Sequence, residues 1–149
     1  MVATIPTGTV SFLFTDVEGS TRLWESDPDG MAASLALHDQ IMRGVIDRHR
    51  GHVFSTAGDA FAVAFGSVGA AVAASTAIQI ELLSADWPGP PINIRMGIHT
   101  GTAEERDGDY FGPVLNRAAR IMSAGHGGQI LLSSVTADAA GFDLSLIHI

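Results

Sequence analysis

Two aspartates at predicted turns are the residues best suited to chemistry in this chain. Asp16 directly follows the apolar run Thr9–Thr15, and Asp59 lies at the tip of a tight turn between two short apolar runs. Carboxylates held at the ends of neighbouring strands can together bind a hard cation such as Mg²⁺, which prefers a few carboxylates plus substrate phosphates. Because Asp is also a favoured turn and N-cap residue, the spacing alone leaves a purely structural role open.

A short polar segment, Glu18-Gly19-Ser20-Thr21, follows Asp16 at once. A glycine at this point lets the backbone turn sharply and present N–H groups at the start of a helix, which suits an anion. A plain strand-to-helix turn capped by Ser20 accounts for the same residues equally well. The chain carries neither a Walker A motif nor a GxGxxG motif, so a P-loop and a Rossmann fingerprint are excluded.

Several other polar residues favour structural interpretations. His49 and His52 have a spacing that zinc can use, but no third ligand lies nearby in the sequence, so a surface role is favoured. His99 follows a predicted buried strand and is expected to make a structural hydrogen bond. Arg22 and Arg117 are expected on solvated faces.

Composition limits the classes of function. The chain has 149 residues, enough for one domain. Its net charge is −8, its eight basic residues are all Arg, and Cys is absent. An acidic chain without a basic cluster is a poor candidate for nucleic-acid binding, and the lack of Cys excludes disulfides and thiolate sites. No apolar run is long enough for a membrane span and no signal peptide is evident, so we expect a cytoplasmic protein, or a cytoplasmic part of one, without a membrane partner.

Hydrophobic periodicity predicts the elements that must position these residues. Strands are predicted at residues 9–15, 52–56, 60–65, 92–99 and 129–133, and helices at 20–24, 28–50, 67–83 and 112–124. Residues 101–108 are predicted to form a loop, and residues 141–149 a strand that stops abruptly. This order is typical of an α+β fold in which helices pack against a ferredoxin-like mixed sheet.

Four blocks of sequence carry a resemblance to a known family. They are FLFTDVEGSTRLWE (12–25), STAGDAFAVAF (55–65), IRMGIHTG (94–101) and DYFGPVLNRAARIM (109–122), and GGQILLS (127–133) follows them. In wording, order and spacing they resemble the class III nucleotidyl cyclase catalytic domain, which implies that family's fold. Because the resemblance covers about residues 8–140, we expect residues 1–149 to form one such domain, incomplete at its C-terminus.

The resemblance implies a metal site and a phosphate site. Asp16 and Asp59 match the two metal-binding aspartates, and the backbone carbonyl of Val17 matches a further metal contact, so two Mg²⁺ or Mn²⁺ ions are expected in each site. Residues Val17, Glu18, Gly19, Ser20 and Thr21 match the loop whose N–H groups hold a triphosphate. Arg95 matches an arginine that contacts the terminal phosphates.

The resemblance also implies that two subunits share each active site. Asn116 and Arg120 match the residues that stabilise the transition state, and their spacing of four places them on one helix face. Asp109 matches the acid that reads the base. In the family one subunit supplies the metal aspartates and the other supplies these three residues, so a homodimer that cyclises a nucleoside triphosphate is expected.

The chain departs from the family pattern at Ser55. The family has a base-reading Lys at this position, whereas a serine hydroxyl carries no charge. Asp109 can still accept from the exocyclic amine of adenine, which favours ATP over GTP. Members of the family continue past the position of residue 149 with further strands and a phosphate-contacting Lys. That Lys has no counterpart here, since the chain has no Lys. The alternative function is a weak or inactive cyclase-like domain that binds nucleotide or dimerises to regulate a partner; a cyclic-dinucleotide synthase of the GGDEF type lacks its signature here.

Overall fold

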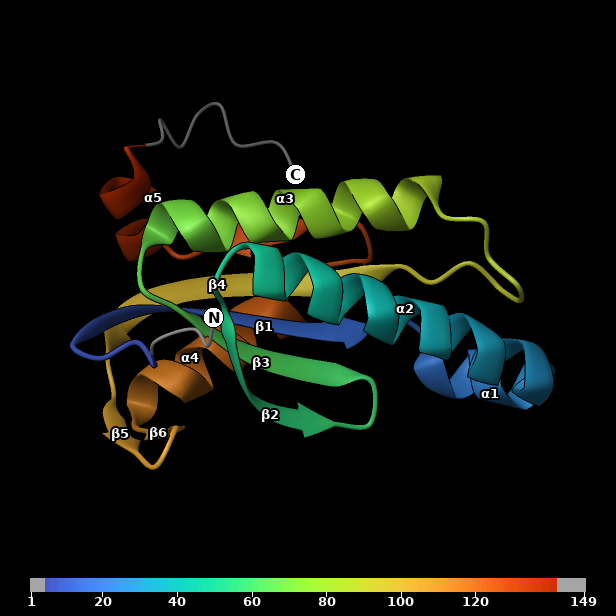
Figure 1. Ribbon diagram of the computed structural model, residues 1–149, viewed down its shortest axis with the longest axis horizontal. Coiled ribbons are helices and arrows are strands. Elements are labelled where there is room, and N and C mark those ends of the chain that lie inside the picture. The colour runs from blue at the N-terminus through green and yellow to red at the C-terminus, as the bar shows by residue number, and fades with distance from the viewer. Residues whose placement is uncertain (1–4, 142–149) are drawn as a thin grey trace.

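A five-stranded sheet forms the centre of the computed structural model, which describes residues 5–141 (Figure 1). The strands lie in the order β2-β3-β1-β4-β7, and all neighbours are antiparallel except β4 and β7, which are parallel. Their bounds are β1 Thr9–Val17, β2 His52–Ala57, β3 Ala60–Phe65, β4 Ile94–Thr102 and β7 Ile130–Leu132. With β1 and β3 inside the sheet, the architecture is the expected ferredoxin-like one, extended by the edge strand β7.

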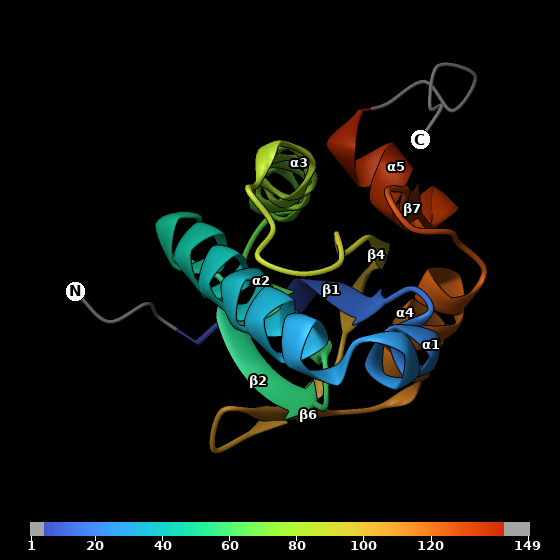
Figure 2. The same cartoon turned by 90° about the vertical axis from the view of Figure 1, so that its right-hand side faces the viewer.

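Helices cover the two faces of this sheet. They are α1 Ser20–Ser26, α2 Pro28–Arg48, α3 Val68–Ser84, α4 Pro113–Ser123 and α5 Ser134–Ala140, and a hairpin of β5 Glu104–Arg106 and β6 Asp109–Phe111 projects from the sheet. Seen end-on, α2 and α3 lie on one side of β1 and α4 lies on the other (Figure 2). No helix within residues 5–141 has the length and apolar character that a membrane crossing needs.

The alternation of side chains along β1 produces two separate hydrophobic clusters. Leu13 and Val17 belong to the larger cluster with α2 and α3, whereas Val10 and Phe12 belong to a smaller cluster that includes Tyr110 and residues of α4. Successive residues of a strand point to opposite faces. Asp16 shares the parity of Val10 and Phe12, so its position on β1 faces the α4 side.

The structure confirms the predicted alternation of elements and differs at several bounds. β1 extends through Asp16 to Val17, because its ladder with β4 continues to the pair Val17–Ile94. The predicted loop at 101–108 instead holds β5 and the turn of a hairpin, in which Asp107 and Gly108 adopt positive φ angles of 53° and 82°. Helix α5 was not predicted, and residues 142–149 of the predicted last strand lie outside the described residues.

Helix α2 begins as its sequence predicts. Asp27 is its N-cap and accepts a hydrogen bond from Gly30 N at 3.0 Å, and Pro28 occupies the first turn. Its buried side chains recur at three- and four-residue steps, which turns one helix face onto the sheet. They are Met31, Ser34, His38, Met42, Val45 and Ile46.

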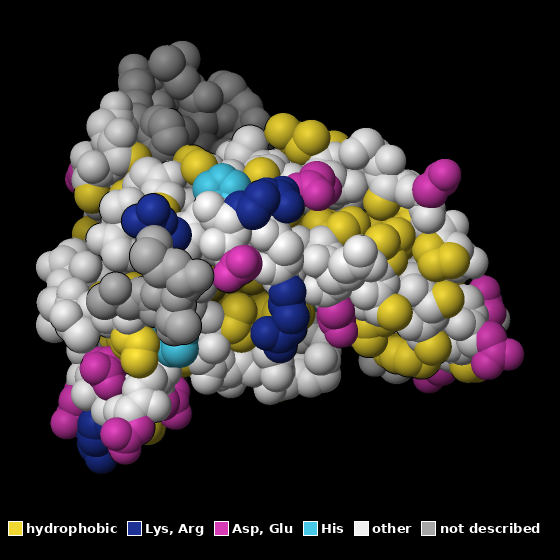
Figure 3. All heavy atoms as spheres, viewed as in Figure 1, with side chains coloured by type: hydrophobic (Ala, Val, Ile, Leu, Met, Phe, Trp, Pro, Cys, Tyr) yellow, Lys and Arg dark blue, Asp and Glu magenta, His cyan; other side chains and the backbone are white. Residues whose placement is uncertain are grey.

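The face that carries α2 and α3 has mixed charge (Figure 3). Arg side chains are dispersed among Asp and Glu side chains there, and Arg48 of α2 pairs with Glu81 of α3 at 2.7 Å. Within the described residues, this face therefore presents no broad basic surface of the kind that nucleic-acid binding needs.

Helix α4 lies directly against the backbone of β4. A Cβ atom at Gly97 would be 2.3 Å from Met122 N, and one at Gly101 would be 2.8 Å from Val114 Cγ2. Glycine at position 97 therefore brings the helix backbone into contact with the strand backbone. This contact fixes the height of α4 above the sheet and hence the position of the residues on its outer surface.

The substitution Gly97→Ala tests this close approach. We expect it to lower the free energy of unfolding by about 1–3 kcal/mol, because the added methyl group overpacks a contact between two backbones. Urea unfolding followed by circular dichroism measures the change. The control Gly69→Ala on α3, where a Cβ meets nothing within 4 Å, should leave stability unchanged or raise it by up to about 1 kcal/mol. Equal stability of Gly97→Ala and the wild type would show that α4 does not depend on this contact.

Candidate functional site

An ion pair between β1 and β4 lies at the centre of the candidate site. Asp16 and Arg95 are cross-strand partners in the β1–β4 ladder. Arg95 Nε donates to Asp16 Oδ1 at 2.7 Å, and Arg95 Nη2 donates to Asp16 Oδ2, so both carboxylate oxygens accept from one guanidinium. The side chain of Asp16 is 20% exposed and that of Arg95 is 28% exposed, which leaves the ion pair accessible from solvent.

Asp59 lies beside this pair, in the turn between β2 and β3. Gly58 has a φ of 60°, which provides the left-handed conformation that the turn needs. Asp59 Oδ1 accepts a hydrogen bond from Val17 N at 3.4 Å. The structure therefore brings both predicted metal aspartates to the same end of β1.

The carboxylates of Asp16 and Asp59 suit a divalent cation that takes its remaining coordinating atoms from water or from a bound ligand. The hydrogen bond to Asp16 is the main cause that raises the pKa of Arg95, and the charges of Asp16, Glu18 and Asp59 add to it. Three carboxylates thus surround one guanidinium, which leaves an excess of negative charge. Within residues 5–141, no three acidic or histidine side chains are arranged to hold an ion by themselves. Mg²⁺ commonly completes such a shell with water and phosphate oxygens.

The predicted phosphate loop runs from the end of β1 into α1. Gly19 is the N-cap of α1 with a φ of 68°, so the predicted cap residue Ser20 is instead the first helical residue, and Thr21 follows it. Glu18 N donates to Asn93 O at 3.0 Å. No side chain caps α1, so the first N–H groups of this helix are available to a ligand.

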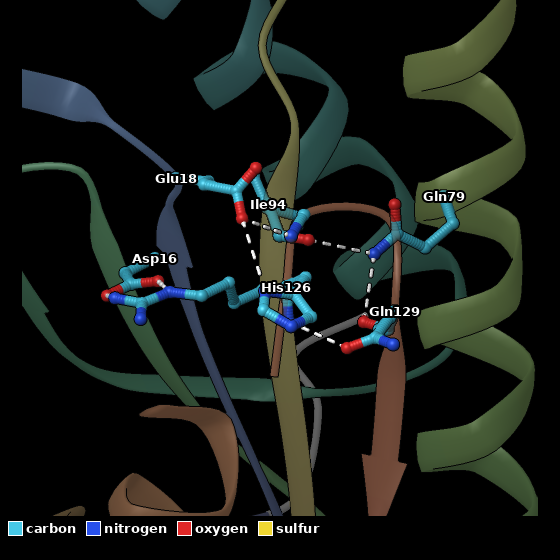
Figure 4. A network of polar contacts seen from close by, with 8 residues as sticks. Asp16, Glu18, Gln79, Ile94, His126 and Gln129 are labelled. Atoms are coloured by element: carbon cyan, nitrogen blue, oxygen red, sulfur yellow. Dashed lines mark hydrogen bonds and ion pairs between the residues drawn. The ribbon is translucent and has the colours of Figure 1, made fainter. Parts of the chain in front are cut away.

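The carboxylate of Glu18 ties this loop to the turn before β7 (Figure 4). Glu18 Oε2 accepts from Gly127 N at 2.8 Å, and His126 Nδ1 lies 4.0 Å from the same oxygen. Beneath this contact, the buried Gln79 of α3 donates through Nε2 to Ile94 O at 3.2 Å and to Gln129 O at 3.4 Å. Glu18 thus ties the phosphate loop to the turn before β7, and Gln79 joins α3 to the start of β4 and to the residue before β7.

Ser55 lines a small apolar pocket on the α4 side of the sheet. It is exposed on β2, next to a register shift in the β2–β3 ladder. The pocket has a volume of about 130 Å³, and its walls include Phe14, Ala62 and Met122. A flat apolar group would find dispersion contacts here, whereas the only polar side chains in the wall are those of Ser55 and Thr15.

Asp109 lies on the projecting hairpin, as the first residue of β6. Its Oδ1 accepts from the neighbouring Tyr110 N at 2.8 Å, and the residue is exposed. Tyr110 is buried, donates to Pro6 O at 2.6 Å and packs edge-on against Phe12 and Phe54. Burial raises the pKa of Tyr110 to about 12. This aromatic cluster fixes the hairpin on which Asp109 lies.

Asn116 and Arg120 lie one turn apart on the exposed surface of α4. Among the described residues, neither forms a side-chain hydrogen bond or an ion pair, either with Asp16 and Asp59 or with other side chains. The structure thus separates the predicted residues into an acidic group at the end of β1 and a polar pair on the outside of α4. Within one chain these groups do not meet.

Sequence reasoning missed how the site residues contact one another. It singled out Asp16 and Arg95 without predicting that they pair, because 79 positions separate them. It gave Glu18 a place in the phosphate loop but did not anticipate its bond to Gly127, 109 positions away. Gln79 was not singled out at all, although a lone Gln in the apolar helix α3 is a signal that could have been used.

Comparison with known proteins relates this arrangement to one family. A family model described as the adenylate and guanylate cyclase catalytic domain matches residues 2–145. An adenylate cyclase of Lachancea kluyveri is 38% identical over 155 aligned positions, which cover 87% of this chain. The chain spans only 8% of the length of that relative.

Solved structures of adenylate and guanylyl cyclases are also similar to this chain. The structure of adenylate cyclases from Trypanosoma brucei in their monomeric state aligns with a TM-score of 0.84 and 29% identity, over 93% of this chain and 78% of that one. The crystal structure of the guanylyl cyclase Cya2 aligns with a TM-score of 0.77 and 28% identity, over 90% of this chain and 79% of that one. The similarity thus extends to enzymes named for either purine nucleotide.

The substitution Arg95→Gln tests whether the ion pair restricts access of a cation to Asp16. Without the guanidinium, Asp16 keeps its charge and loses its competing partner, so we expect Mn²⁺ to bind roughly threefold to tenfold more tightly. Electron paramagnetic resonance titration of Mn²⁺ without nucleotide measures this affinity. Arg106→Gln removes an arginine that pairs with Glu104 on the hairpin and should have no effect. Unchanged or weaker binding by Arg95→Gln would contradict the expected competition.

Proposed function

Because the chain belongs to the adenylate and guanylate cyclase catalytic domain family, we propose that it converts ATP to 3′,5′-cyclic AMP and pyrophosphate. The observation that supports this most is the convergence of Asp16, Asp59 and Arg95 at the end of β1, directly before the turn into α1. This convergence combines anionic groups for a cation with a cationic group for phosphate. The reaction needs both at one place.

Divalent cations contribute the central chemistry in this proposal. Two Mg²⁺ or Mn²⁺ ions held by Asp16, Asp59 and the Val17 carbonyl would lower the pKa of the ribose 3′-hydroxyl and stabilise the leaving pyrophosphate. Within the loop of residues 17–21, Val17 N and Glu18 N already donate to Asp59 and Asn93. The backbone N–H groups of residues 19–21, at a turn that no side chain caps, would therefore hold the triphosphate. Arg95 releases Asp16 and binds the terminal phosphates, for which a planar guanidinium is well suited.

A second copy of the chain completes each site in this proposal. Asn116 fixes the ribose by hydrogen bonding, and Arg120 stabilises the charge that develops on the phosphoryl oxygens. Both are exposed on α4 and, among the described residues, form no hydrogen bond or ion pair with Asp16 or Asp59 of their own chain. A symmetric homodimer would place them opposite the partner's aspartates and build two equivalent sites.

The base pocket supports ATP as the substrate. Asp109 can accept a hydrogen bond from the exocyclic amine of adenine. Ser55 offers a hydroxyl at the place where the family has a base-reading Lys, and the surrounding pocket is apolar. Since the Ser55 hydroxyl can either donate or accept, it discriminates little between the two bases. The inferred preference for ATP over GTP therefore depends on Asp109 and is modest.

The alternative is a cyclase-like domain that binds nucleotide or dimerises without turnover. The uncharged Ser55 is the observation that favours it. We further propose that residues 1–149 form a single catalytic domain with a core at about 8–140, and that it acts in the cytoplasm, where its nucleotide substrate is found. The relative from Lachancea kluyveri is many times longer, so any regulatory partner domains would lie outside this segment.

Product detection tests the proposed reaction. The purified protein, incubated with ATP or GTP and Mn²⁺, should release cyclic AMP in preference to cyclic GMP, as measured by mass spectrometry. Asp59→Ala should lower the rate at least about a hundredfold, because it removes a group that stabilises developing charge. A folded dimer that releases no cyclic nucleotide at high protein concentration would favour the regulatory alternative.

Mixing two inactive variants tests the shared site. Asp59→Ala and Arg120→Ala should each be inactive alone. In an equimolar mixture, half of the dimers are mixed, and each mixed dimer contains one intact site. The mixture should therefore recover up to about a quarter of wild-type activity. Recovery would be absent if each chain formed its site from its own residues.

A further inference from the structure

A second pocket, with polar side chains in its walls, lies on the α4 side of β4. Of the proposed catalytic residues Asn116 and Arg120, only Arg120 lines it. Its volume is about 260 Å³, and its walls are formed by His99, Gly101, Pro113, Val114, Arg117 and Arg120. None of these residues lines the Ser55 pocket. His99 contacts Ser133, which directly follows β7, so this pocket extends toward the β7 edge of the sheet. We call it the His99 pocket.

Two arginines give the His99 pocket a positive charge. Arg117 and Arg120 are three residues apart on α4, a spacing that places side chains on the same part of a helix surface. Among the described residues, neither guanidinium forms an ion pair with a carboxylate, and no acidic residue lines the pocket. Such a concentration of positive charge stands out in a chain whose net charge is −8.

His99 supplies a fixed polar group at the base of this pocket. The residue is only 5% exposed, and its Nδ1 lies 2.7 Å from Ser133 Oγ. That hydroxyl is itself held by Thr136 N at 3.2 Å and Thr136 Oγ1 at 2.9 Å, which fixes the imidazole ring. Nε2 makes no hydrogen bond with any described residue, so it is the ring nitrogen left for a ligand.

The protonation state of His99 suits a hydrogen bond to an anion. Burial lowers the pKa of His99, and the positive charge of Arg117 lowers it further, so the ring is neutral at pH 7. When Ser133 donates to Nδ1, Nε2 carries the ring proton and becomes a donor directed at the ligand. The positive charge in the pocket then comes from the two arginines alone.

We propose that the His99 pocket binds a phosphate-type oxyanion through the guanidinium groups of Arg117 and Arg120 and through Nε2–H of His99. The planar guanidinium donates two parallel hydrogen bonds to phosphate oxygens, which makes Arg the usual residue for such recognition. The volume is below the roughly 300–1,000 Å³ of pockets that enclose larger organic ligands. It suits inorganic phosphate, pyrophosphate or the phosphoryl group of a larger molecule.

Binding in the His99 pocket would also affect Arg120. This consequence rests on the proposed function, whereas the binding itself does not. An anion bound to Arg117 and Arg120 holds the Arg120 guanidinium against its own chain, away from the partner's nucleotide. Phosphate or pyrophosphate would then inhibit turnover without occupying the site at Asp16 and Asp59.

Calorimetric titration of the wild-type protein with inorganic phosphate and with pyrophosphate tests the binding. Arg117→Gln should weaken it at least about tenfold, the loss expected for hydrogen bonds to a charged group. Arg50→Gln makes the same charge change at an exposed residue beyond the end of α2 and should bind as the wild type does. Equal binding by the two variants would overturn the proposal.

Two further measurements separate this pocket from the proposed catalytic site. If Arg95→Gln abolishes phosphate binding and Arg117→Gln does not, the anion binds beside Asp16 and the proposal is wrong. In the unmodified protein, phosphate should shift the ring resonances of His99 and leave those of His52 unchanged, a result that requires no variant to fold.

Binding of glycerol 3-phosphate as tight as that of inorganic phosphate would identify a phosphoryl group of a larger molecule as the ligand, and binding of the inorganic anions alone would identify a free anion. Failure of all three probes to bind would overturn the proposal.

Discussion

The antiparallel ladder between β1 and β4 is the constraint on which the rest of the structure depends. It joins nine residue pairs, from Thr9–Thr102 to Val17–Ile94. Because side chains alternate along each strand, this register directs Asp16 and Arg95 to one face, and Leu13 and Ile98 to the other. A shift of one residue in β1 would bury Asp16 in the apolar cluster beneath α2 and α3. Hydrophobic burial on one face therefore determines which charged groups meet on the other.

The sequence was sufficient to predict the alternation of strands and helices, because apolar periodicity is a local property. The predicted order of elements and the ferredoxin-like architecture are confirmed, and so is the family. The short helix Ser134–Ala140 escaped prediction because its Ser, Thr and Ala residues form no amphipathic pattern. The β5–β6 hairpin was not predicted because its strands have only three residues each and all three residues of β5 are charged.

The candidate site was predicted as a set of residues but not as a geometry. Their positions at predicted turns drew attention to Asp16 and Asp59, and the family resemblance selected Asn116 and Arg120. The catalytic roles of all four residues remain predictions. The bidentate contact of Arg95 with Asp16 follows from strand register, which no local pattern encodes. Arg117 is exposed, as the sequence predicted. Its place beside His99 in the wall of a pocket depends on how α4 packs on β4, which the local pattern does not show.

The close contact at Gly97 also determines how motion can pass through the domain. Most helices rest on a sheet through a layer of side chains, whose rotamers can absorb small displacements. Here the backbone of α4 at Met122 touches the backbone of β4 directly, so the contact has no compliant layer. Gly97 lies two residues from Arg95 on the same face of the strand. A displacement of α4 is therefore expected to move β4, the strand that carries Arg95, so that helix and strand move together as one rigid unit.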